Sequence, residues 1–124
     1  MNSTMTILKI MPGRKPEKIT IPHTLDAMQR LVCGNIQAIY PYEDLVAVVC
    51  NEEGKLLGME PNRVIRNEDG DIRDIICGTF FICGLTEDDF GSLTEEQITC
   101  YTKLFQYPET FLWNGYNLVV LQMA

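Results

Sequence analysis

The sequence predicts a single α+β domain over residues 1–124, with a mixed, mainly antiparallel sheet and two principal helices packed on it. The length of 124 residues and the hydrophobic fraction of 46% suffice for one core without disulfide or metal staples. Short β-rich runs separated by turn residues predict the strands. Two segments that combine a capping residue with one apolar face, residues 24–33 and 94–107, predict the helices.

The first part of the chain predicts a hairpin and then a helix. Residues 5–11 are rich in β-formers, and residues 18–21 alternate between polar and apolar, so we expect them to pair. Thr24 can cap a helix that runs to Cys33, because Gly34 can adopt the left-handed conformation that stops a helix. Two further β-rich runs follow, residues 36–40 and 45–50.

The middle of the chain predicts a second hairpin and a central strand. Residues 45–50 should pair with residues 55–58, with Gly54 supplying a positive φ in the loop between them. Residues 60–74 are polar and rich in turn formers, which indicates a loop. Residues 75–83 are almost wholly apolar, as expected of a central strand that is covered on both faces.

The last part predicts a helix and a third hairpin. Thr94 and Gln97 match a capping box, with Leu93 and Ile98 placed as its hydrophobic staple, so a helix should begin there and extend to Tyr107. Asn114 and Gly115 are the strongest two-residue hairpin signal. They separate two apolar runs, residues 111–113 and 116–121.

The net charge of −7 disfavours general binding to nucleic acids and to anionic membrane surfaces. The acidic residues stand in small groups that are typical of solvated turns, with mimicry of DNA as the alternative interpretation. The first ten residues lack the pattern of a secretory signal, and no apolar run is long enough to span a bilayer. We therefore expect a cytoplasmic protein.

The five cysteines predict reduced thiols in the core rather than a metal site. They form no CxxC pair, and His23 is the one histidine of the chain, so neither a zinc site of standard spacing nor a Cys-His nucleophile pair can be built. Residues 67–71 resemble a calcium loop but lack its spacing. No phosphate-binding glycine motif is present. We expect no cofactor and no metal.

Asn62 and Arg63 are the candidate binding residues. An amide and a guanidinium beside one another suit a carboxylate or phosphate ligand, in a pocket completed by Tyr40 and the backbone of Gly78 and Thr79. In the alternative interpretation both residues are structural. Asn62 would then cap a short helical turn over residues 62–66, while Arg63 pairs with an acid such as Asp71 or Asp74.

Several motifs together resemble the domain of unknown function 3846 family. They are Pro12-Gly13-x-x-Pro16, Leu31-Val32-x-Gly34-x-Ile36, Asn51-Glu52-Glu53-Gly54-Lys55-Leu56-Leu57-Gly58, Asn62-Arg63 and Asp74-Ile75-Ile76-x-Gly78-Thr79. The resemblance covers roughly residues 5 to 90. It implies a small protein of Gram-positive bacteria, their phages and other mobile elements, and it implies no mechanism.

We therefore expect a small non-enzymatic accessory protein of a mobile element, which acts by binding a protein partner. Tyr40, Pro41 and Tyr42, together with Trp113 and Tyr116, could form its aromatic contact surface, although plain core and edge packing would explain them equally well. The alternative function is a small-ligand-binding domain with its pocket near Asn62 and Arg63. An enzyme ranks third, and a homo-oligomer is compatible with these features.

Overall fold

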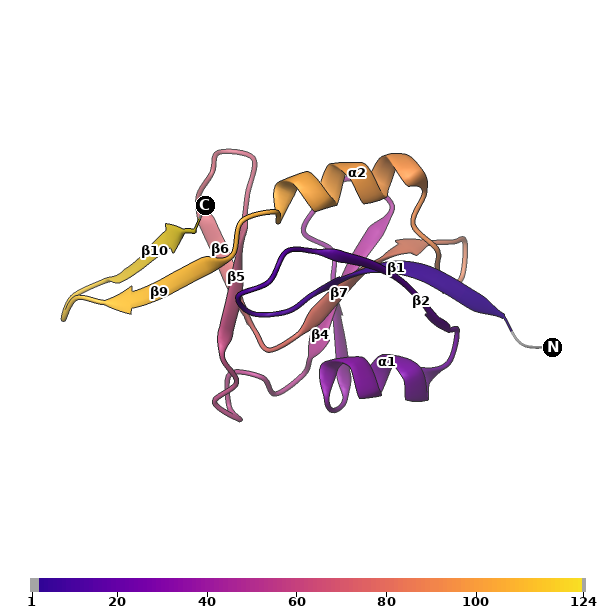
Figure 1. The fold of residues 1–124 in the computed structure, drawn as a ribbon, viewed down its shortest axis with the longest axis horizontal. Helices are drawn as coiled ribbons and strands as arrows, with labels where there is room; N and C mark the ends of the chain where they lie inside the picture. The colour runs from indigo at the N-terminus through magenta and orange to yellow at the C-terminus, as the bar shows by residue number, and fades with distance from the viewer. Residues whose placement is uncertain (1–2, 124) are drawn as a thin grey trace.

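The computed structural model of the protein describes residues 3–123, which form ten strands and two helices. Figure 1 shows their arrangement. In chain order they are β1 (Thr4–Ile10), β2 (Glu17–Pro22), α1 (Leu25–Val32), β3 (Ile36–Ile39), β4 (Val46–Asn51), β5 (Pro61–Arg66), β6 (Ile72–Cys77), β7 (Phe80–Leu85), β8 (Phe90–Gly91), α2 (Glu95–Leu104), β9 (Glu109–Trp113) and β10 (Leu118–Gln122).

The strands form one large sheet and two small ones. The large sheet has the order β2-β1-β7-β4-β3, with the short β8 also paired to β7. β5 and β6 form a two-stranded sheet, as do β9 and β10, and every strand pair among the described residues is antiparallel. The prediction of a mixed, mainly antiparallel sheet with two helices is thus confirmed in part, because the fold is dominated by strands, at 44% strand against 15% helix, rather than being a balanced α+β fold.

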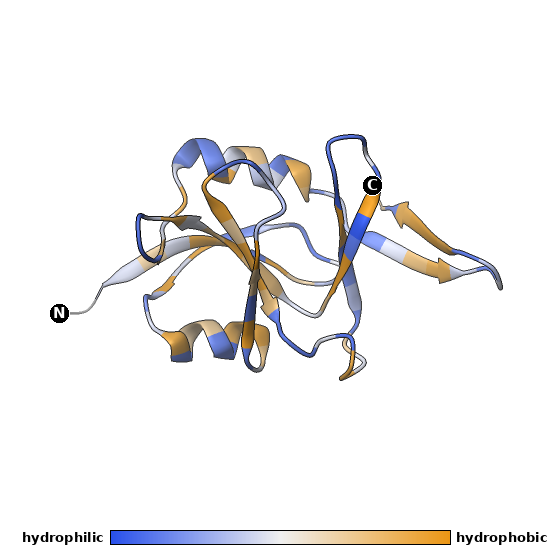
Figure 2. Ribbon diagram, turned by 180° about the vertical axis from the view of Figure 1, so that it is seen from behind, coloured by the Kyte–Doolittle hydropathy of each residue, from blue (hydrophilic) through white to orange (hydrophobic). Residues whose placement is uncertain are grey.

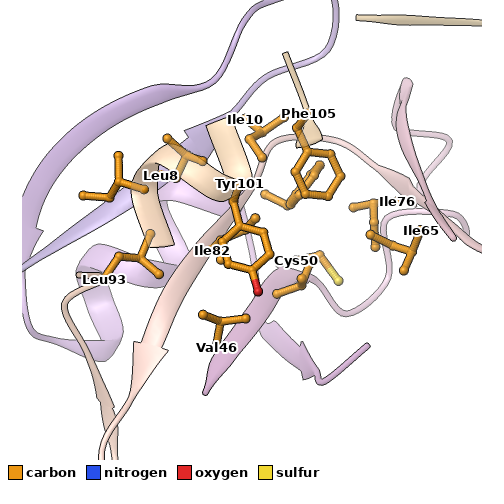
Figure 3. Packing of buried hydrophobic residues seen from close by; sticks show 13 residues of the cluster. Leu8, Ile10, Val46, Cys50, Ile65, Ile76, Ile82, Leu93, Tyr101 and Phe105 are labelled. Carbon is orange, nitrogen blue, oxygen red and sulfur yellow. The ribbon is translucent and has the colours of Figure 1, made fainter. Parts of the chain in front are cut away.

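The large sheet has a core on each face, with α2 on one side and α1 on the other (Figure 1). Alternate residues of the inner strands divide between them: Phe80 and Ile82 of β7 belong to the α2 side, and Phe81 and Cys83 to the α1 side. Figure 3 shows Tyr101 and Phe105 among the buried residues on the α2 side. β4 and β7 are therefore buried on both faces, as the apolar run in the sequence predicted for a central strand.

Both predicted helix starts are confirmed. The Thr24 side chain accepts a hydrogen bond from the Ala27 amide at 3.1 Å, and α2 begins with the complete capping box of Thr94 and Gln97. α2 ends at Leu104, three residues before the predicted end at Tyr107. Among the described residues, neither helix combines the length and apolar character needed to cross a bilayer.

The end of α1 differs from the prediction. Cys33, with φ 64°, adopts the left-handed conformation that was expected of Gly34. The buried Asn51 side chain stabilises this end, because its amide donates to the Val32 and Cys33 carbonyls at 3.1 and 3.2 Å. Gly34 leaves room for the Asn51 side chain, since a Cβ at residue 34 would lie 2.7 Å from the Asn51 amide nitrogen.

The predicted hairpin between residues 45–50 and 55–58 is wrong. β4 already has β3 on one edge and β7 on the other, so no edge remains for another strand. Residues 52–58 instead form consecutive turns, in which the Leu57 amide donates to the Glu53 carbonyl at 2.9 Å. Gly54 is not among the positive-φ glycines; it is required because a Cβ would lie 2.7 Å from the Cys77 carbonyl oxygen.

We expect Gly54→Ala to lower the free energy of unfolding by about 1–3 kcal/mol, since the clash is with backbone that cannot move aside cheaply. The matched control is Gly70→Asn, at the open turn between β5 and β6, where φ is +87° and asparagine tolerates the left-handed region. Urea titrations of the two variants provide the measurement. Equal stability of Gly54→Ala and the wild type would contradict the close approach seen here.

The polar segment over residues 60–74 is not a loop. Most of it forms the hairpin of β5 and β6, closed by a turn in which the Asn67 side chain accepts the Asp69 and Asp71 amides at 3.0 and 2.9 Å. The predicted single strand over residues 75–83 is divided into β6 and β7 at Gly78, which has φ +84°. The predicted helical turn over residues 62–66 is also wrong, because these residues lie in β5.

Candidate functional site

A cavity of about 520 Å³ lies between α2, the β5–β6 hairpin, the loop after β3 and the β9–β10 hairpin. This volume lies within the range of small-molecule sites. Its walls combine aromatic and aliphatic side chains with several carboxylates: Pro41, Tyr42, Glu43, Arg63, Val64, Arg66, Asn67, Glu68, Gly70, Cys100, Tyr101, Leu104, Phe105, Tyr107, Glu109 and Gln122.

Arg63 lies behind this cavity with only 1% of its surface exposed. All five of its N–H groups are used, in five hydrogen bonds to oxygen atoms of three residues. Nε and Nη2 donate to the Phe105 carbonyl at 3.3 and 3.0 Å, and Nη2 also donates to the Arg14 carbonyl at 2.6 Å. Nη1 donates to the carbonyl and side-chain oxygens of Asn62 at 3.3 and 2.8 Å. The guanidinium thus has no donor left for a ligand.

The charge of Arg63 is balanced mainly by carbonyl oxygens. None of the ion pairs found among residues 3–123 includes Arg63, so the predicted pairing with Asp71 or Asp74 is wrong. Phe105 is the C-cap of α2, where the helix dipole presents partial negative charge to the guanidinium. Burial lowers the pKa of Arg63, and the nearby Glu109 carboxylate opposes this shift. Arg63 therefore joins β5 to the end of α2 and to the loop after β1.

Asn62 is fully buried and completes the same network. Its amide nitrogen donates to the Ile10 and Gly78 carbonyls, both at 2.9 Å, while its side-chain oxygen accepts from Arg63. At Gly78, a Cβ would lie 2.7 Å from the Met59 sulfur. The contacts of Asn62 and Arg63 therefore correspond to a structural role, in a strand rather than a helical turn.

The structure joins three of the five predicted site residues and separates one. Asn62, Arg63 and Gly78 are linked by hydrogen bonds, and the partly buried Thr79 follows directly in the chain. Tyr40 is 61% exposed and does not line the cavity. Tyr42, which is two residues further along the chain, does line the cavity.

Tyr42 and Tyr101 form an aromatic wall of the cavity. The sequence placed Tyr42 in a candidate aromatic contact surface and assigned Tyr101 to no site. Their ring centroids lie 5.3 Å apart, and the Tyr101 hydroxyl donates to Asp44 at 2.9 Å. Burial raises the pKa of both tyrosines, and for Tyr101 the bond to Asp44 adds to the rise. The sequence contains half of the signal, because its spacing from Ile98 and Phe105 places Tyr101 on the apolar face of the predicted helix. Nothing local joins that helix to the loop before β4.

Asp44 ties that loop to α2. Asp44 is exposed; the slight desolvation of its carboxyl would raise its pKa, but hydrogen bonds from the Gln97 side chain, the Tyr101 hydroxyl and the Leu45 amide outweigh this and lower it. A carboxyl whose folded pKa is depressed contributes stability above its unfolded pKa and loses it as the pH falls through the folded value.

We therefore expect Tyr101→Phe to reduce the loss of stability between neutral and strongly acidic pH, because part of what depresses the pKa of Asp44 is removed. Thermal melting between roughly pH 7 and roughly pH 2.5 covers the titration of carboxyl groups. It measures the loss of stability on acidification for the wild type and for Tyr101→Phe. Asp26→Asn, which breaks an exposed pair with Arg30 on α1, serves as the control. An unchanged acid loss in Tyr101→Phe would contradict the role assigned to this bond.

The remaining candidates are possible metal ligands, His23 and the five cysteines, of which Cys100 lines the cavity. Among residues 3–123 no group of three or more His, Cys, Asp and Glu side chains is placed to hold a metal ion. His23 lies 3.3 Å from Asp89. All five cysteines are free, as predicted, but Cys33 and Cys100 are exposed, so the prediction that all face the core is wrong. Cys83 is the most strongly shifted thiol, since burial raises its pKa to about 12.

The predicted hairpin is present as β9 and β10 but with a longer loop than the predicted two-residue turn, since Trp113 pairs with Leu118 and residues 114–117 connect the strands. It forms a surface of a different kind. We call residues 109–122 the apolar ribbon; it projects from the rest of the fold (Figure 1), and Figure 2 shows hydrophobic residues along both of its strands. Trp113 and Tyr116 near its tip are 69% and 87% exposed. The aromatic residues here are therefore surface groups rather than core packing.

Comparison with known families matches residues 5–106 to the family described as Domain of unknown function (DUF3846). The chain belongs to this family. No curated protein and no solved structure matches the chain significantly. The matched residues of this DUF3846 protein include both helices and the Asn62–Arg63 network, and they end before the apolar ribbon begins at Glu109.

Proposed function

We propose that this DUF3846 protein is a non-enzymatic accessory protein that acts by binding a protein partner through its apolar ribbon. The observation that carries the proposal is the exposure of large apolar side chains on a projecting hairpin, Leu112, Trp113, Tyr116, Leu118 and Leu121, and on Met123 directly after it. Apolar and aromatic patches of this kind mark interaction sites, and tryptophan and tyrosine are enriched among the residues that dominate binding energy.

The biological setting is part of the same proposal. The family resemblance suggests a protein carried by phages and other mobile elements of Gram-positive bacteria, where a small acidic protein could modulate a host system such as a defence pathway. Beyond Glu109 at its base, the ribbon carries no charged side chain, since residues 110–122 include no Asp, Glu, Lys or Arg, and this suggests recognition by shape and apolar contact.

The test compares the replacement of two exposed, large hydrophobic side chains, one on the ribbon and one away from it. Trp113→Ser alters the ribbon, and Leu56→Ser alters a leucine that is 85% exposed in the turns after β4. Proteins captured from a Gram-positive host lysate are identified, purified and titrated against both variants. We expect Trp113→Ser to weaken binding by about tenfold or more, as for a central interface residue, and Leu56→Ser to leave it unchanged. Equal binding by the wild type and Trp113→Ser would contradict the proposal.

A second candidate function, small-ligand binding, is favoured by the 520 Å³ cavity. Because the Arg63 donors are already used, the groups that would contact a ligand are the Tyr42–Tyr101 wall, Glu109 and Arg66, rather than the predicted pair. Native mass spectrometry after exposure to a metabolite extract tests it. Leu104→Trp, which places a larger side chain at the cavity, should abolish any adduct that occupies this site.

A further inference from the structure

The walls of the 520 Å³ cavity carry more carboxylates than cations that could neutralise them. Glu43, Glu68 and Glu109 line it, against the guanidinium groups of Arg63 and Arg66. The donors of Arg63 are all used within the protein, and the exposed Arg66 donates to a carbonyl oxygen of the β5–β6 turn at 2.8 Å. None of the ion pairs found among residues 3–123 includes these three carboxylates. The charges of the cavity therefore favour a cationic ligand.

Glu109 offers the most specific contact for such a ligand. Its side chain is partly buried at the start of β9, and its Oε1 oxygen accepts the Val64 amide at 2.7 Å. The Oε2 oxygen has no hydrogen-bond partner among the described residues, yet no buried side-chain oxygen or nitrogen among them lacks one. Oε2 is therefore accessible, and it belongs to a residue that lines the cavity. A ligand that covers this charged oxygen has to donate a hydrogen bond to it, since burying an unpaired charge is costly.

The carboxylates are too dispersed to hold an inorganic cation. A metal ion takes several oxygen ligands at distances of about 2–2.6 Å. Among residues 3–123, no three side chains of His, Cys, Asp or Glu are placed to share one ion. A cation that suits this cavity therefore carries a body of its own and meets a single carboxylate through a hydrogen bond. The volume of the cavity admits an organic molecule.

The aromatic wall suits the body of such a molecule. The rings of Tyr42 and Tyr101, with centroids 5.3 Å apart, line the cavity together with Leu104 and Tyr107. Aromatic rings pack against other rings and attract cations to their faces. The Tyr101 hydroxyl donates to the Asp44 carboxylate, which adds a negative charge next to this wall. An apolar or aromatic body with a positive charge is thus matched in both respects.

We infer that this cavity binds a small organic amine in its protonated form, with its ammonium group at Glu109 and its apolar body on the Tyr42–Tyr101 wall. This inference rests on the second candidate function, small-ligand binding, and names the class of ligand. An anion of the same size would be repelled by the carboxylates, and a neutral molecule would gain no charge-assisted hydrogen bond.

The experiment uses three soluble probes that share a phenyl ring and differ in charge: phenethylamine, phenethyl alcohol and hydrocinnamate. Shifts of the amide NMR signals of the protein, at neutral pH and physiological salt, measure binding. We expect phenethylamine to bind with a Kd on the order of 1–10 mM, as for a ligand with few non-hydrogen atoms. The shifts should centre on the residues that line the cavity. The alcohol and the carboxylate should bind about tenfold more weakly or less.

Two variants with the same change of charge locate the site. Glu109→Gln keeps an acceptor for the Val64 amide but removes the charge, so it should weaken phenethylamine binding about tenfold. Glu87→Gln, at an exposed residue that does not line the cavity, is the matched control and should bind like the wild type. Both variants raise the net charge of −7 by one, so general attraction to an acidic protein cannot separate them. Tyr42→Leu, which keeps an apolar side chain but loses the ring, should weaken binding about threefold.

The spectra of the free variants show whether each one folds. Several results would overturn the inference: no shift with phenethylamine at about 50 mM, well above the expected Kd, hydrocinnamate binding as tight as that of phenethylamine, or equal binding by Glu109→Gln and Glu87→Gln. The proposals fail separately. A metabolite without an amine whose adduct is abolished by Leu104→Trp refutes the amine class alone. Captured proteins that bind Trp113→Ser as tightly as the wild type refute the ribbon proposal alone, because Trp113 does not line the cavity.

Discussion

Arg63→Met should lower the free energy of unfolding by about 3–5 kcal/mol, because it removes the partner of several buried oxygen atoms at once. Methionine keeps much of the volume and the flexible stem of arginine, so the loss isolates the hydrogen bonds from the packing. The carbonyls of Phe105 and Arg14 and the side-chain oxygen of Asn62 would all lose a donor. The C-terminus of α2 would lose its counter-charge as well.

The control for this prediction is Arg66→Met at the end of the same strand. Arg66 is exposed and makes one hydrogen bond, to the Gly70 carbonyl at 2.8 Å, so its replacement should cost less than about 0.5 kcal/mol. Arg63→Lys should fall between the two, because an ammonium has three donors and cannot match the planar fork. Urea denaturation measures all three. If Arg63→Met were as stable as Arg66→Met, Arg63 would have no structural role.

Gly84→Val should have an effect of similar size. Gly84 lies in the central strand β7, paired with Val46 on one side and Gly91 on the other. A Cβ built at this position overlaps the Ser92 carbonyl oxygen, which is backbone and cannot rotate away. We expect a loss of about 3 kcal/mol or more, through displacement of β8 or strain in β7.

Gly91→Ala, in the paired strand, is the natural comparison for Gly84→Val. Its Cβ would meet only the Thr86 methyl group, at 2.9 Å, and that side chain can adjust. Its cost should therefore stay near 1 kcal/mol. Thermal melting of Gly84→Val and Gly91→Ala under the same conditions compares the two losses of stability. A smaller loss for Gly84→Val than for Gly91→Ala would mean that β8 does not pack against β7 as described.

The sequence determined those features whose causes lie within a few residues. The capping box at Thr94 and the cap at Thr24 each depend on hydrogen bonds and dihedral preferences of adjacent residues, and both are present. The hairpin indicated by Asn114 and Gly115 also forms, but with residues 114–117 as its loop rather than the predicted two-residue turn. The apolar run that includes Phe80 to Cys83 predicted a strand buried on both faces, because such strands are almost continuously apolar in sequence. Glycines inside strand-like runs, such as Gly78 and Gly84, also indicate special backbone or close approach. Gly78 has φ +84°, and a Cβ at Gly84 would overlap backbone.

Tertiary structure decided the features that depend on which groups meet across the chain. Residues 55–58 resemble a strand, but the edges of β4 are taken by strands from elsewhere in the sequence. Asn62 and Arg63 resemble an exposed polar site, but the partners that allow their burial are the carbonyls of Ile10, Arg14 and Phe105. The cavity wall of Tyr42 and Tyr101 likewise joins residues 59 positions apart in the numbering. A local pattern records how polar a residue is, whereas its burial depends on hydrogen-bond partners that only the folded chain supplies.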